Sequence, residues 1–138
     1  RKIIHFTYPH PEYYAIRLRS AGYCEAMKEH GLEPTILTSR QEDELLEKVR
    51  INQVDAVFCH NDWLALSILR RLQNAGINVP EQISLLGVDN SPTFNELCPD
   101  LTTMAYPANW IAAETLKFLT RKGQPAAPPQ LPVIQRKT

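Results

Sequence analysis

The chain has 138 residues, of which 43% are hydrophobic, and 15 basic side chains balance 15 acidic ones. This length and composition suit one domain with a real core and exclude a disordered chain. A net charge of zero argues against a surface that grips nucleic acid, and no apolar run is long enough for a membrane span. Because the chain starts at Arg1 rather than Met, we expect a piece of a longer protein, and the absence of a signal peptide decides little.

The three cysteines, Cys24, Cys59 and Cys98, are widely scattered. An odd, unclustered set fits a reducing compartment, so we expect a cytoplasmic protein. These spacings form no metal or redox motif, and small core residues are the simplest interpretation. We expect no metal and no cofactor.

Apolar runs alternate with segments of helical spacing. The expected strands are residues 2–7, 34–38, 54–59, 83–88, 101–104 and 131–136, and the expected helices are residues 12–30, 41–50, 63–75 and 108–121, with one helical turn at 94–97 and an extended linker at 124–130. In the first helix, Tyr14, Leu18, Ala21, Cys24 and Met27 are expected to face the sheet. This alternation predicts an α/β fold of three layers, a mainly parallel sheet with helices on both faces.

The most informative stretch is residues 54–90, which predicts a buried strand, a helix and a second buried strand. The first strand exits into Asn61 and Asp62, and Asp62 is the expected cap of the following helix. The second strand exits into Asp89. Because ligands of open α/β sheets bind beyond the carboxyl ends of the strands, Asn61 and Asp89 occupy equivalent places, with side chains suited to hydroxyl groups.

The same stretch resembles the effector-binding domain of the LacI/GalR (lactose-repressor/galactose-repressor) family of bacterial transcription regulators. The residues that carry the resemblance are DAVFCHNDWLALSILRRLQNAGINVPEQISLLGVDN, the later DLTTM and the upstream RLRSAGY. The order and spacing of the ND-AL, G-VP-I, GVDN and LTT signatures are more specific than any one motif.

The resemblance implies one lobe of a periplasmic-binding-protein-like type I fold, in which the ligand is clamped between two lobes. Residues 1–104 would form the carboxy-terminal lobe of the effector-binding domain. Residues 105–123 would be a crossing segment and helix that belong to an amino-terminal lobe outside this chain. Residues 124–138 would be a linker and closing strand.

Five residues are candidates for ligand binding: Arg19, Asn61, Asp89, Tyr8 and Trp63. In the resembled family, an arginine in the position of Arg19 projects into the effector cleft, and a guanidinium suits paired sugar hydroxyls or a carboxylate. The alternatives remain open: Arg19 as a solvated helix residue, Asn61 as a helix cap, and the two aromatic residues as packing.

The resemblance also implies the function, which is small-molecule sensing and dimerisation in a DNA-binding repressor whose headpiece lies outside this chain. The expected partners are a sugar or sugar derivative, a second copy and, through the headpiece, DNA. The expected dimer surface includes Leu69, Arg70, Gln73, Phe94 and Leu97.

Two other classes of protein share part of this sequence pattern. A periplasmic sugar-binding transport receptor would share the fold, although the LGVDN and LTT context is closer to the repressors. A phosphoacceptor receiver domain would fit the length of the chain and the place of Asp62 beyond a third strand. This chain, however, lacks the acidic pair that such a domain has after its first strand. We expect no enzyme and no catalytic residue, because G-x-S-x-G, a phosphate loop and zinc spacings are absent.

Overall fold

The fold is a single parallel sheet with one antiparallel edge strand. The computed structural model describes residues 1–120, 123–124 and 126–138. Within them the elements are, in chain order, β1 (Ile3–Thr7), α1 (Tyr14–Glu29), β2 (Thr35–Thr38), α2 (Glu42–Arg50), β3 (Ala56–Cys59), α3 (Asp62–Asn74), β4 (Ser84–Asp89), α4 (Pro92–Leu97), β5 (Thr103–Ala105), α5 (Ala108–Leu119) and β6 (Val133–Ile134). The predicted alternation is therefore confirmed, and the predicted helix end at Arg121 lies outside the described residues.

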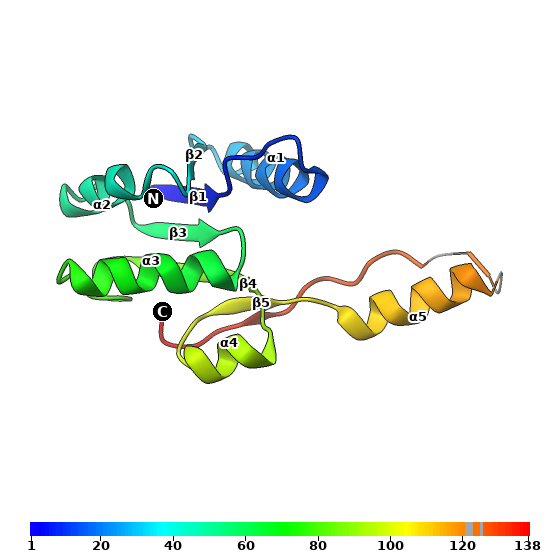
Figure 1. Cartoon of the computed structure of the whole chain (residues 1–138). Coiled ribbons are helices and arrows are strands. Elements are labelled where there is room, and N and C mark those ends of the chain that lie inside the picture. The colour runs from blue at the N-terminus through cyan, green and yellow to red at the C-terminus, as the bar shows by residue number, and fades with distance from the viewer. Residues whose placement is uncertain (121–122, 125) are drawn as a thin grey trace.

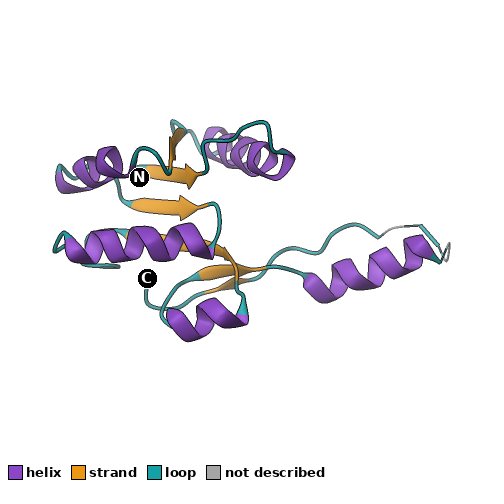
Figure 2. Cartoon of the chain, in the orientation of Figure 1, coloured by secondary structure: helices purple, strands orange, loops and turns teal. Residues whose placement is uncertain are grey.

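The sheet has the strand order β2-β1-β3-β4-β5-β6 within the described chain (Figure 2). The first five strands pair in parallel, and β6 pairs antiparallel with β5. The register places Phe6 opposite Cys59 and Asp89 opposite Ala105. The carboxyl ends of β1, β3, β4 and β5 consequently meet at one edge of the sheet.

Helices cover both faces of the sheet, as predicted. Side chains alternate along β1, so Ile4 and Phe6 join the main core, which also holds Leu45 from α2 and Ile68 from α3. His5 points to the other face, where its ring lies 5.4 Å from the ring of Tyr23 on α1. The layers of the α/β fold therefore follow from the period of two in the strands.

The face of α1 that meets the sheet differs from the predicted one. The buried residues of α1 are Ile16, Tyr23 and Met27, whereas Tyr14 and Leu18 are 67% and 50% exposed. The Tyr23 hydroxyl donates to the Ile3 carbonyl at 2.8 Å, so a polar anchor sets the rotation of the helix. Of the residues expected to face the sheet, Met27 is buried, and Cys24 is only partly so.

Beyond the sheet, α5 and the returning segment extend away from the other elements (Figure 1). We call this region, the described residues between Tyr106 and Pro132, the α5 arm. Leu116, Phe118 and Leu119 are 62%, 70% and 71% exposed. Glu114 joins the two sides of the arm, because its carboxylate accepts from the Lys117 ammonium at 2.6 Å and from the Ala126 amide at 2.8 Å. The arm is thus an apolar helix with little of the lobe beside it.

Candidate functional site

The candidate site lies at the edge of the sheet where the parallel strands end. Tyr8 follows β1, Asn61 follows β3, and Asp89 is the last residue of β4. These ends are adjacent because β3 lies between β1 and β4. In α/β folds, this edge is where ligands bind.

Arg19 reaches this edge from the second turn of α1. Its Nη1 donates to the His60 carbonyl oxygen, at the exit of β3. Burial lowers the pKa of the Arg19 guanidinium, while the nearby charge of Asp89 opposes that shift. The hydrogen bond to His60 holds the guanidinium in place, so its remaining N–H groups are prearranged donors. Arg19 is therefore not a freely solvated helix residue.

Asn61 is both a helix cap and a member of the site. It is the N-cap of α3, and its Oδ1 accepts from the Leu64 amide at 3.1 Å. The same oxygen accepts from the Tyr8 hydroxyl at 3.2 Å. A carbonyl oxygen has two lone pairs, so these two bonds use its accepting capacity and leave the amide NH₂ as a donor.

Asp89 occupies an unusual backbone conformation. Its φ is 119°, and that of Asn90 is 50°, both in the region that side-chain-bearing residues rarely adopt. Burial raises the pKa of Asp89, the charge of Asp62 adds to that rise, and Arg19 opposes it. Among the described residues no direct ion pair joins Asp89 to Arg19. The carboxylate is thus an acceptor held near a cation without being neutralised by contact.

Tyr8 belongs to the site through Asn61 and His60. Its hydroxyl is bonded to Asn61, and its ring meets the His60 ring edge-on, with centroids 5.4 Å apart. His60 is 7% exposed, and burial, together with the charges of Arg19 and His5, lowers its pKa to about 4. The His60 imidazole beside the Tyr8 ring is therefore neutral near pH 7.

Trp63 is not brought together with these residues. It is 61% exposed, and its ring packs edge-on against Phe94, with centroids 5.9 Å apart. It lines a cavity of about 520 Å³ with side chains of α2 and α3, including Glu42, Ser67 and Arg71. The geometry thus unites four of the five predicted ligand residues and places Trp63 on the outer side of α3.

The expectation that Asp62 caps α3 is wrong, because Asn61 is the cap. Asp62 is instead 1% exposed and bonded to the first residue of β5 and to the residue that follows β4. Its carboxylate accepts from the Thr103 hydroxyl at 2.6 Å and from the Asn90 amide at 2.8 Å. Both partners are remote in sequence, so local spacing alone does not distinguish this role from capping.

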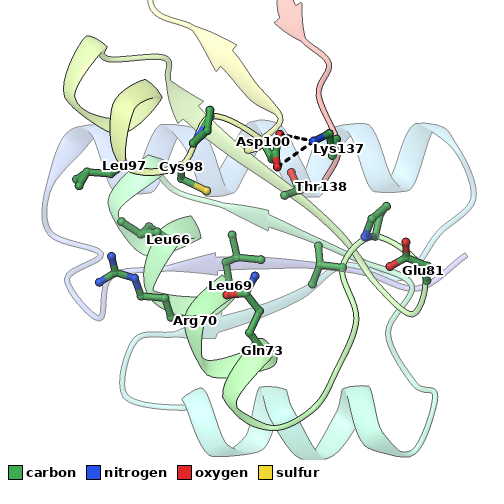
Figure 3. A pocket seen from close by; sticks show the side chains of 13 residues that line it. Leu66, Leu69, Arg70, Gln73, Glu81, Leu97, Cys98, Asp100, Lys137 and Thr138 are labelled. Carbon is green, nitrogen blue, oxygen red and sulfur yellow. Dashed lines mark hydrogen bonds and ion pairs between the residues drawn. The ribbon is translucent and has the colours of Figure 1, made fainter.

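The predicted dimer residues lie elsewhere, on the side of α3 that faces the loop after α4. Leu69, Arg70, Gln73 and Leu97 line a cavity of about 560 Å³ (Figure 3). Leu97 is 54% exposed at its rim, while Phe94 is partly buried against the core. The other wall includes Asp100 and Lys137, paired at 3.1 Å. This surface combines exposed apolar and charged groups.

Comparisons with known proteins identify the class. The family model of the periplasmic binding protein-like domain matches residues 1–138. The chain therefore belongs to the periplasmic binding protein-like domain family, here in the form of a LacI/GalR effector-binding domain fragment.

Individual relatives are repressors and regulators. The HTH-type transcriptional repressor PurR of Vibrio campbellii is 34% identical over 122 residues, which cover 82% of this chain and 36% of that protein. A periplasmic binding protein/LacI transcriptional regulator from Alkaliphilus metalliredigens, complexed with D-xylulofuranose, superposes with a TM-score of 0.75 at 26% identity, covering 100% of this chain and 56% of that one. A lac repressor dimer bound to operator shares the fold, with a TM-score of 0.77 at 21% identity over 99% of this chain and 52% of that one.

The chain thus spans about a third of the length of the curated relative and about half of the solved chains. Among the described residues, no helix combines the length and apolar character needed to cross a membrane.

Proposed function

We propose that this chain is the small-molecule-sensing part of a bacterial DNA-binding transcription regulator. The observation that carries the proposal is the set of groups at one sheet edge: the Arg19 guanidinium, the Asn61 amide and the Asp89 carboxylate. Two donors and one acceptor suit a ligand rich in hydroxyl groups. A sugar or sugar derivative is the class we infer, and the D-xylulofuranose complex of the Alkaliphilus relative supports it.

The chain would supply one wall of the ligand cleft. Residues 1–104 are proposed as the carboxy-terminal lobe, 105–123 as the segment that crosses to a second lobe, and 124–138 as the linker and closing strand; Arg121, Lys122 and Pro125 lie outside the described residues. The exposed apolar side chains of the α5 arm support this division, because such a helix is stable only against a partner.

Signalling would follow from closure of the cleft. A ligand that contacts both lobes stabilises the closed arrangement by its differential affinity and shifts the population between DNA-competent and DNA-incompetent states. The zero net charge of this chain supports the proposal that DNA is contacted by a separate headpiece. Such a regulator would work in the cytoplasm as a homodimer, with the surface around Leu69 and Leu97 as part of its interface.

The alternative of a periplasmic transport receptor keeps the fold and the sugar but not the repressor. The curated relative from Vibrio campbellii is a transcriptional repressor, which favours the first proposal. A receiver domain is disfavoured because the carboxylate of Asp62 is buried and engaged with Thr103 and Asn90.

The direct test is a nuclear magnetic resonance titration of the 138-residue chain with D-xylulose, followed by a panel of pentoses, hexoses and disaccharides. We expect shifts confined to the Asn61 side-chain NH₂, the Asp89 amide and the Arg19 side chain. Glycerol controls for non-specific contacts of hydroxyl groups, and adenine tests a purine instead. Shifts with adenine alone would replace the sugar, whereas no localised shift with any probe would contradict the assignment of the site.

A further inference from the structure

The residue Asp62 has a role that neither capping nor ligand binding describes. It is the first residue of α3, yet its carboxylate lies against β4 and β5 and is shielded from solvent, at 1% exposure. One oxygen accepts from the Thr103 hydroxyl at 2.6 Å, and the other accepts from the Asn90 amide at 2.8 Å. One side chain therefore ties the start of α3 to the start of β5 and to the residue that follows β4.

A second observation shows that the neighbouring strand is shaped around this carboxylate. A Cβ added to Gly87 of β4 would overlap Asp62 Oδ1 and would lie 3.3 Å from Asp62 Cγ and 3.4 Å from Ala65 Cβ. The φ of Gly87 is not in the left-handed region, so the backbone does not require glycine there. Space for the carboxylate is the reason that remains for glycine at this position.

The turn that Asp62 holds is the strained one. Asp89 and Asn90 have φ values of 119° and 50°, which cost free energy unless the surroundings impose them. Asn90 is held from a second side as well, because Arg136 Nη2 donates to its Oδ1 at 3.0 Å while Arg136 Nη1 donates to the Leu101 carbonyl at 2.9 Å. Asn90 is thus hydrogen-bonded by two charged side chains, Asp62 at its backbone amide and Arg136 at its side chain.

From this geometry we propose that Asp62 is a positioning residue for the ligand site: it imposes the left-handed Asp89–Asn90 turn that presents the Asp89 carboxylate opposite Arg19, and Gly87 admits it. This inference rests on the proposed function only in that it takes the sheet edge to be a ligand site. The control of the turn by Asp62 stands on the hydrogen bonds alone. Burial raises the pKa of Asp62, and the hydrogen bonds from Thr103, Asn90 and Ser91 oppose that rise. These hydrogen bonds therefore stabilise the carboxylate in its buried position.

The test reads the turn and the binding separately in the 138-residue chain. A strong intraresidue amide–Hα nuclear Overhauser effect marks a positive φ. We expect it at Asp89 and Asn90 in the wild type, retained in Asp62→Asn, which keeps an acceptor for the Asn90 amide, and lost in Asp62→Ala. Affinity for D-xylulose, or for whichever sugar of the panel shifts the Asn61 amide, is expected to fall about tenfold or more in Asp62→Ala and to recover in Asp62→Asn.

Ile83→Val is the matched control, because it destabilises the same lobe from the buried core without touching the turn. If Asp62→Ala keeps the Overhauser effects and the affinity as this control does, its role is only structural and the inference is overturned. Should Asp62→Ala not fold, Gly87→Ala on β4 displaces the same carboxylate and is expected to remove the same Overhauser effects. If no sugar binds the wild type, the proposed function fails, while the Overhauser effects still decide what Asp62 does.

Discussion

The sheet edge buries polar side chains, whereas the α5 arm exposes apolar ones. At the edge, polar groups that sequence alone would place in solvent are bonded inside the lobe: Asp62 is 1% exposed and His60 is 7% exposed. In the arm, apolar groups that would be expected in a core are open, with Phe118 at 70%. The comparison teaches that the buried polar groups of the edge find their partners within the described residues of this chain, whereas the apolar side chains of the arm stay exposed.

The largest contrast is expected in stability. Phe6→Ala removes a fully buried ring from the core and should lower the free energy of unfolding by about 3–5 kcal/mol. Phe118→Ala truncates a ring of the same size in the arm and should change it by less than about 0.5 kcal/mol. Urea denaturation followed by circular dichroism measures both. A large cost for Phe118→Ala would mean that the arm packs on the lobe in solution.

A second contrast concerns pH. The pKa of His60 falls from 6.5 in the unfolded chain to about 4 in the fold, because burial and the charges of Arg19 and His5 disfavour the imidazolium. Between these two values the unfolded state binds the proton more readily, so stability is complete above pH 6.5 and declines as the pH falls toward 4, by about 1–3 kcal/mol.

Denaturation at several pH values checks this decline, and His60→Gln should flatten it. His5 contributes in the same direction, because burial lowers its pKa too. An unchanged pH slope in His60→Gln would show that His60 titrates normally and that the edge is open to water.

The third prediction concerns binding at the edge. Arg19→Lys keeps the charge but replaces the planar fork with a single ammonium, which cannot hold the His60 carbonyl and present further fixed donors to a ligand. Affinity for the sugar that binds should fall about tenfold, with little change in the melting temperature. Arg17→Lys is the control, because Arg17 is exposed on the same helix. Equal effects of the two substitutions would remove Arg19 from the site.

The smallest expected effect concerns self-association. Leu97→Glu places a charge at the exposed rim of the cavity between α3 and the C-terminus and should weaken dimerisation by about 1 kcal/mol. Ile51→Glu, at an exposed position that follows α2, is the control. Sedimentation velocity measures the association. An unchanged profile for Leu97→Glu would exclude this surface from the interface.

Much of the edge could be predicted from sequence because its elements are local. Residues 54–90 carry a buried strand, a cap, a helix stop and a second strand in one run, so the approach of Asn61 to Asp89 follows from topology. The family resemblance, and not the residue spacing, predicts Arg19 as a member of the site. The structure brings it to the same edge through the His60 carbonyl.

What could not be predicted depends on contacts between distant segments. The role of Asp62 requires Thr103, 41 residues away, and its local context is equally that of a cap. The rotation of α1 is set by the hydrogen bond of Tyr23 to Ile3, so the apolar pattern of that helix predicts the wrong buried face. Trp63 lies only two residues after Asn61 in sequence, yet its ring packs against Phe94.

The saturated oxygen of Asn61 has a consequence for how a sugar would be read. Since Oδ1 already accepts from Leu64 and Tyr8, this side chain offers a ligand only hydrogens. Asp89 offers only lone pairs. A ring position facing Asn61 would therefore tolerate fluorine in place of hydroxyl, because fluorine accepts weakly, whereas the position facing Asp89 would not, because fluorine cannot donate. A series of monofluorinated sugars would thus orient the ligand in the cleft, one hydroxyl at a time.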